Sequence, residues 1–149
     1  MTADFSTILA SIGRQRLHQE RDNKVNKEAV FDALNQAGIT RIEVEFDGEG
    51  DDGQIESVTA YAGEEAVELP TARVTFQRTG WNETEPQREE AALPDAVERL
   101  CYGYLEQEHG GWENNDGAYG TFEIDVAARK VELDFNQRVS DSVHFGYEF

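Results

Sequence analysis

The sequence is short of basic residues and of cysteine. Only 13 of its 149 residues are Lys or Arg, against 31 Asp or Glu, so its formal net charge is −18 at pH 7. A charge of this sign and size repels phosphate, which argues against direct binding to nucleic acid. The single cysteine excludes an internal disulfide and a cysteine-rich metal site.

Long apolar runs are also missing. No stretch of about 18 apolar residues is present, so no membrane span is expected. The first residues lack the basic start of a secretory signal, which predicts a soluble cytoplasmic protein. Eight Phe, five Tyr and two Trp are too many aromatic residues for a disordered acidic chain, so we expect a folded domain.

The N-terminal part carries helical patterns. Apolar side chains within residues 5–12 recur at i, i+3, i+4 and i+7, which predicts a helix running to about Glu20. The polar segment 22–26 is expected to break this helix. Asn26 would then cap a second helix that stops at Gly38.

The remainder alternates mainly between apolar and polar residues, as strands do. We expect strands over 41–47, 54–61 (with a bulge), 73–77, 122–126 and 131–135, a strand or docked extension at 143–149, a helix from Pro94 to His109 and a loop over 79–92. The expected fold is therefore one α+β domain over residues 1–149. Two helices would lie in residues 1–38, and a mainly antiparallel sheet with one central helix in residues 39–149.

The stretch FDGEGDDGQIES, residues 46–57, places five acidic residues and three glycines in twelve positions. An EF-hand loop starting at Asp47 would need glycine at Asp52 and glutamate at Val58, so that register fails. A turn between two strands explains the glycines. Loose binding of a divalent cation by the carboxylates of residues 47–52 stays open.

Carboxylates also occupy the polar positions of several expected strands. If the apolar positions face the core, these carboxylates face water roughly 6.7 Å apart along each strand. Rows of this kind imitate the charge of a phosphate backbone, provided that the strands share one sheet with aligned faces. A merely soluble acidic surface is the alternative. The expected partner-binding residues are Glu43, Glu45, Asp47, Glu49, Asp51, Asp52, Glu123, Asp125, Glu132 and Asp134.

A glycine-rich connection, residues 108–122, is a second candidate surface. It contains Trp112, Asn114, Asn115 and Asp116, which suit a recognition loop on a rigid scaffold. A long turn with Trp112 packed on the core is the structural alternative.

No enzyme motif is present. Three histidines occur without metal-ligand spacing, and Cys101 falls on the apolar stripe of its helix. A Cys101–His109 nucleophile pair would join two residues eight positions apart on one helix. We therefore expect no enzyme, no cofactor and no metal, while an unrecognised enzyme around His109 stays open.

The segments FDGEGDDGQIE, YLEQEHGGWENNDGAYGTFEIDV and VELDFNQRV resemble an uncharacterised family, a domain of unknown function of small acidic proteins from bacterial plasmids and phages. The resemblance covers about residues 40–149. It implies an accessory protein of a mobile element, a class that includes inhibitors of restriction enzymes and CRISPR effectors, some of them DNA mimics.

These observations predict an acidic interaction protein that binds the basic surface of a nucleic-acid-binding protein. An anti-CRISPR or anti-restriction inhibitor is the function expected. A cation-binding module centred on residues 47–52 is the alternative of a different class. An unpaired tail strand would also allow a homodimer.

Overall fold

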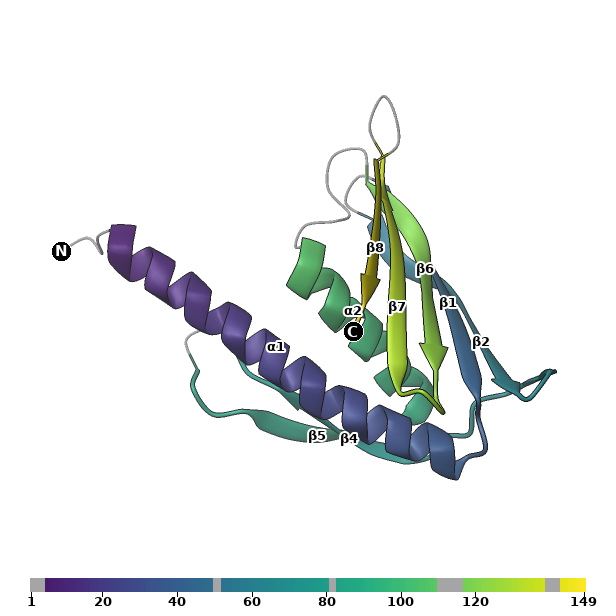
Figure 1. The fold of residues 1–149 in the computed structure, drawn as a ribbon. Helices are drawn as coiled ribbons and strands as arrows, with labels where there is room; N and C mark the ends of the chain where they lie inside the picture. The colour runs from purple at the N-terminus through teal and green to yellow at the C-terminus, as the bar shows by residue number, and fades with distance from the viewer. Residues whose placement is uncertain (1–4, 50–51, 81–82, 110–116, 139–142) are drawn as a thin grey trace.

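The computed structural model describes residues 5–49, 52–80, 83–109, 117–138 and 143–149. Helices and strands follow one another along these residues as Figure 1 labels them. Their bounds are α1 Phe5–Gln36, β1 Arg41–Glu49, β2 Asp52–Ala62, β3 Glu65–Val67, β4 Arg73–Arg78, β5 Gln87–Ala92, α2 Leu93–His109, β6 Ala118–Asp125, β7 Lys130–Gln137 and β8 Val143–Glu148.

Six strands form one antiparallel sheet in the order β3-β2-β1-β6-β7-β8. The expected bulge is present: Glu45 lies opposite Ser57 while Phe46 lies opposite Ile55, so β2 holds one extra residue, Glu56. The tail residues 143–148 pair with β7 as a strand. The protein is therefore α+β with a mostly antiparallel sheet, as the alternation indicates.

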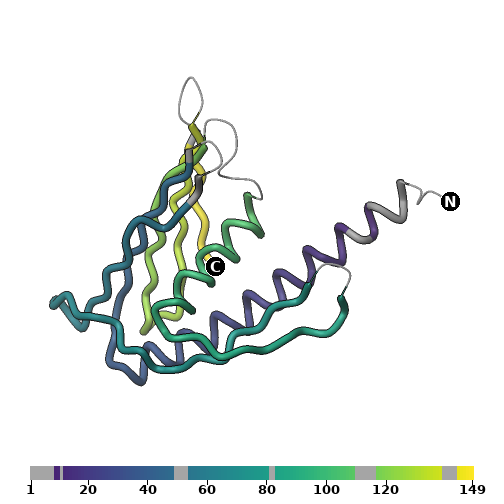
Figure 2. Tube along the Cα trace, turned by 180° about the vertical axis from the view of Figure 1, so that it is seen from behind, coloured from purple at the N-terminus to yellow at the C-terminus, as the bar shows by residue number. Residues whose placement is uncertain are grey.

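The prediction of two N-terminal helices is wrong. A single helix, α1, runs through the expected break at residues 22–26, and Figure 2 shows it as one continuous rod. The turn-forming side chains there bind tertiary partners. Asn26 accepts a hydrogen bond from the backbone N–H of Gln77 at 2.7 Å and donates one to its carbonyl at 2.8 Å. Asn23 donates to the Gly103 carbonyl and to Gln107 of α2. Because these side chains bond to other elements, they do not compete for the backbone groups of α1, and the helix continues.

The prediction of a loop over residues 79–92 is wrong for the second half of this segment. Residues 87–92 form β5, which pairs with β4 in a separate two-stranded ribbon. Four of its six residues are polar, and only Ala91 is fully buried, so no alternation marks the strand. The ribbon packs on both helices, mainly through β4 on α1.

One face of the six-stranded sheet is covered by helix. The α2 residues Leu100, Cys101 and Tyr104 are buried, and the Tyr104 ring contacts Phe122 of β6. Pro94 lies in the first turn of α2, as expected. The C-terminal half of α1 adds the buried side chains of Val30, Phe31 and Leu34 to the same core. The opposite face of the sheet carries no helix (Figure 1), so its side chains face solvent.

Candidate functional site: an acidic face on the sheet

The uncovered face of the sheet collects carboxylates from four adjacent strands, β1, β6, β7 and β8. Along β1, β6 and β7 buried apolar residues alternate with these acids, and in β8 the apolar neighbours are partly buried. The acids therefore project from the side opposite to the helices. We call this side the acidic face. Its carboxylates are those of Glu43, Glu45, Asp47, Glu123, Asp125, Glu132, Asp134 and Glu148.

Four of these residues form a straight row across the strands. Glu43 lies opposite Glu123, Glu123 opposite Glu132, and Glu132 opposite Glu148. Adjacent strands lie about 4.8 Å apart, so successive members of this glutamate row are closer than alternate residues along a strand. Like charges in directly opposed positions destabilise a sheet. The row therefore costs folding free energy.

Basic side chains bind mainly at the ends of the row. Arg41 pairs with Glu43 and with Glu123, the latter at 3.1 Å, and Lys130 pairs with Glu148 at 3.1 Å. Hydrogen bonding to Glu43 raises the pKa of Arg41, and hydrogen bonding to Glu148 raises that of Lys130. Glu132 takes part in none of the ion pairs found among the described residues. Its charge adds to the raised pKa of the nearby Lys130.

The next acids along the face have partners of their own. Arg138 donates two hydrogen bonds to Asp47, at 2.8 and 3.1 Å, and its guanidinium lies 4.8 Å from the Tyr119 ring centre. The Nε2 atom of His144 lies 2.7 Å from Oδ1 of Asp134. Asp47 is thus already occupied by a guanidinium, which disfavours it as a cation ligand.

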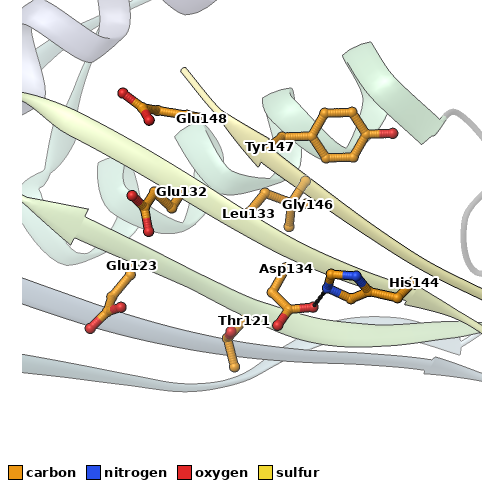
Figure 3. A pocket seen from close by; sticks show the side chains of 9 residues that line it. All are labelled: Thr121, Glu123, Glu132, Leu133, Asp134, His144, Gly146, Tyr147 and Glu148. Atoms are coloured by element: carbon orange, nitrogen blue, oxygen red, sulfur yellow. Dashed lines mark ion pairs between the residues drawn. The ribbon is translucent and has the colours of Figure 1, made fainter.

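The face is hollowed between β6, β7 and β8. The hollow has a volume of about 440 Å³ and lies beside the glutamate row. Figure 3 shows Glu123, Glu132 and Glu148 extending from successive strands, with Asp134 and His144 nearby. Oxygen acceptors arranged in this way suit the ammonium and guanidinium groups of lysine and arginine side chains.

The residues considered for enzyme chemistry are placed in the core or beside it. Cys101 is fully buried, and burial raises the pKa of its thiol, which keeps the sulfur protonated. His109 stacks on Phe135 with 3.8 Å between ring centres, and its Nε2 lies 2.8 Å from the Tyr147 hydroxyl. Burial lowers the pKa of His109. Neither residue has the exposed, activated form that a nucleophile pair needs.

The described residues hold no cluster of three or more His, Cys, Asp or Glu side chains with metal-binding geometry. Neither helix of the described part is long and apolar enough to cross a membrane.

A family model described as "Family of unknown function (DUF6878)" matches residues 23–149. The chain belongs to this family. No curated protein and no solved structure gives a significant match. The match to DUF6878 includes all of the acidic face and α2. It leaves out the N-terminal half of α1.

The sequence-predicted residues divide into three groups within this DUF6878 domain. Six of them lie together on the acidic face as expected: Glu43, Glu45, Glu123, Asp125, Glu132 and Asp134, with Asp47 at its edge bound to Arg138. Glu49 and Asp52 are backbone partners at the end of the β1–β2 hairpin. Asp51, Trp112, Asn114, Asn115 and Asp116 lie outside the described residues.

Glu148, which completes the row, was not predicted from the sequence. The signal for it was present, because Phe145 and Tyr147 alternate with His144 and Glu148 in the tail. The basic residues Arg41 and Lys130 were also missed as parts of the face. Only the strand register places them beside the row.

Proposed function

We propose that this DUF6878 protein is a cytoplasmic acidic interaction protein of a mobile genetic element. Its acidic face would occupy the nucleic-acid groove of a host defence protein, a CRISPR effector or a restriction enzyme. It would thereby exclude DNA or RNA by mimicking their charge. The mobile-element context rests on the sequence resemblance described above, and the mimicry rests on the geometry of the face.

The glutamate row is the observation that carries this proposal. Nucleic acid carries one charge per 3.4 Å along each strand. The row presents carboxylates at about 4.8 Å spacing across four strands, which is a comparable linear density. A face selected for solubility alone would mix both signs and avoid opposed like charges.

The net charge of the face points to a basic partner. Eight carboxylates stand against Arg41, Lys130 and Arg138, and the side chains of Glu123 and Glu148 are 54% and 56% exposed. Lysine and arginine side chains that normally contact phosphates would find oxygen acceptors here. Association driven in this way is fast, and it weakens steeply as salt rises.

The test is affinity capture from a bacterial host lysate with the immobilised protein, followed by elution with short duplex DNA. We expect nucleic-acid-binding proteins in the DNA eluate. The triple variant Glu123→Lys, Glu132→Lys, Glu148→Lys should lose them. The matched control reverses three exposed glutamates away from the row, Glu64, Glu68 and Glu85, and changes the net charge equally. Equal capture by both variants would refute the assignment to this face.

A further inference from the structure

The two edges of the six-stranded sheet differ in how they are protected. At one edge β3 is only three residues long and is soon followed by Pro70, which are common guards against strand addition. At the other edge β8 extends over six residues, Val143–Glu148, with no proline or lysine. Its pairing within the described residues is with β7 alone. Among the described residues no further strand pairs with β8, so another strand can add at this edge.

The backbone groups that β8 presents outward can be identified from its ladder. Phe149 and Val131 exchange both backbone hydrogen bonds, at 2.7 and 3.4 Å. Antiparallel pairs alternate between bonded and non-bonded positions, so Tyr147 and Phe145 also bond toward β7. The N–H and C=O groups of Glu148, Gly146 and His144 therefore point away from the sheet.

Gly146 lies in the middle of this outward set, and nothing in the described part of the chain requires a glycine there. A Cβ added to it would meet only His144 Cε1, at 3.7 Å, and its φ is not positive. The centre of β8 is therefore uncrowded where a second strand would approach, and alanine would fit there as well as glycine.

We propose that the protein forms a two-fold dimer in which β8 pairs antiparallel with β8 of a second copy, centred on Gly146. Gly146 then lies opposite Gly146, and His144 lies opposite Glu148 of the second copy. Each of these three pairs can exchange two backbone hydrogen bonds, about six in all.

The side chains favour a second copy in this register. His144, whose ring also contacts Asp134 of its own chain, meets the carboxylate of Glu148 twice, once on each side of the axis, and Phe145 meets Tyr147 on the opposite face. A histidine–carboxylate hydrogen bond and an aromatic cross-strand pair both stabilise a sheet. Centring the pair on Phe145 or Tyr147 would leave one outward residue of β8 without a partner in the opposing β8 and would lose the His144–Glu148 pairs.

The dimer has two structural consequences. The acidic faces of both copies lie on the same side of one continuous sheet, which doubles the charged surface. Figures 1 and 2 both show the N-terminal half of α1 running out past the β8 side of the sheet. Leu9, Ile12 and Leu17 on this half are 51%, 51% and 64% exposed. A second copy on β8 would lie on the side of the sheet toward which this half of α1 extends.

The first test is sedimentation equilibrium of the purified chain at about 0.15 M ionic strength, where the Debye length is about 8 Å. We expect a reversible monomer–dimer equilibrium. Gly146→Pro removes an N–H that β7 does not use and should give a monomer. Gly146→Ala adds a methyl group in open space and should keep the dimer. A wild-type monomer at every concentration, or a dimer unaffected by Gly146→Pro, would overturn the proposal.

The second test addresses register through charge. His144→Glu should weaken the dimer by roughly tenfold or more, since two hydrogen-bonding pairs become pairs of like charges. His144→Lys should retain it. Circular dichroism melts of each variant separate a lost interface from a lost fold. Equal dimerisation of the folded Glu and Lys variants would contradict this register. The measurement needs no partner protein, so its outcome is independent of the proposed inhibitory function.

Discussion

Glu132 lies directly opposite Glu123 on one side and directly opposite Glu148 on the other, in the middle of three antiparallel strands. Arg41 and Lys130 bind the flanking members of the row, and Glu132 joins none of the ion pairs found among the described residues. This arrangement keeps repulsion in the folded state. We interpret the repulsion as the cost of a surface that binds something basic.

Neutralising the centre of the row should stabilise the protein. Glu132→Gln removes two opposed like-charge contacts, and we expect the free energy of unfolding to rise by about 0.2–1 kcal/mol at low salt. The gain should shrink as salt is added, because the residue is exposed. Urea denaturation checks it, with Glu64→Gln as an exposed control away from the row. A loss of stability on Glu132→Gln alone would show that the carboxylate is favourably paired.

The continuity of α1 depends on Asn26. Asn26→Ala removes both hydrogen bonds to the Gln77 backbone at a site only 2% exposed, which leaves buried polar groups unpaired. We expect a loss of about 1–3 kcal/mol in the free energy of unfolding. Asn35→Ala, on the exposed side of the same helix, should change it little. Similar effects for both variants would argue against the Asn26–β4 contact.

The close packing of the sheet at Gly120 gives a third prediction. A Cβ at this position would overlap the carbonyl oxygen of Asp134 and lie 2.9 Å from Cζ of Phe46. Gly120→Ala should therefore destabilise the fold by about 1–3 kcal/mol. Gly146→Ala in the same sheet has open space and is the matched control. Thermal melts that do not distinguish the two variants would contradict the described register.

The lone thiol reports on the integrity of the core. Cys101 is fully buried, and burial raises the pKa of its thiol, so thiolate is scarce in the folded state. An aromatic disulfide reagent at mildly alkaline pH should modify no thiol until denaturant is added, and one thiol afterwards. Rapid modification of the folded protein would show that this helix face is accessible.

His109 links stability to pH. Burial lowers its pKa in the folded state, with a smaller opposing effect of Glu108. The unfolded chain then binds more protons below about pH 6.5, so stability should fall as pH drops through this value. His109→Gln should flatten the dependence between about pH 5.5 and 7, where carboxylates titrate little. An unchanged slope in urea midpoints across this window would exclude His109 as its source.

The sequence predicted the sheet well where burial is one-sided. Residues 122–126 and 131–135 alternate strictly, and they form the hairpin that carries half of the acidic face. Alternation alone also assigned Glu43 and Glu132 to solvent. It could not place them opposite each other, because register depends on pairing between strands far apart in the chain.

The errors have one physical source, which is tertiary contact overriding local preference. Asn23 and Asn26 favour caps and turns in isolation, but in the fold they bind α2 and β4 and the helix continues. The polar segment 87–92 becomes a strand because β4 offers it a partner. Glu148 could have been found from the tail pattern, had residues 143–149 been treated as a full strand.

If the acidic face mimics nucleic acid, it competes with DNA for the groove of its partner. The most direct test takes a defence protein captured by this chain, loads it with a fluorescent duplex, and follows fluorescence anisotropy as the chain is added. We expect displacement by the wild type, and by the Glu64, Glu68 and Glu85 reversal control. The Glu123, Glu132 and Glu148 reversal variant should leave the duplex bound. A duplex that stays bound beside the wild-type chain, or that both variants displace equally, would contradict the mimicry.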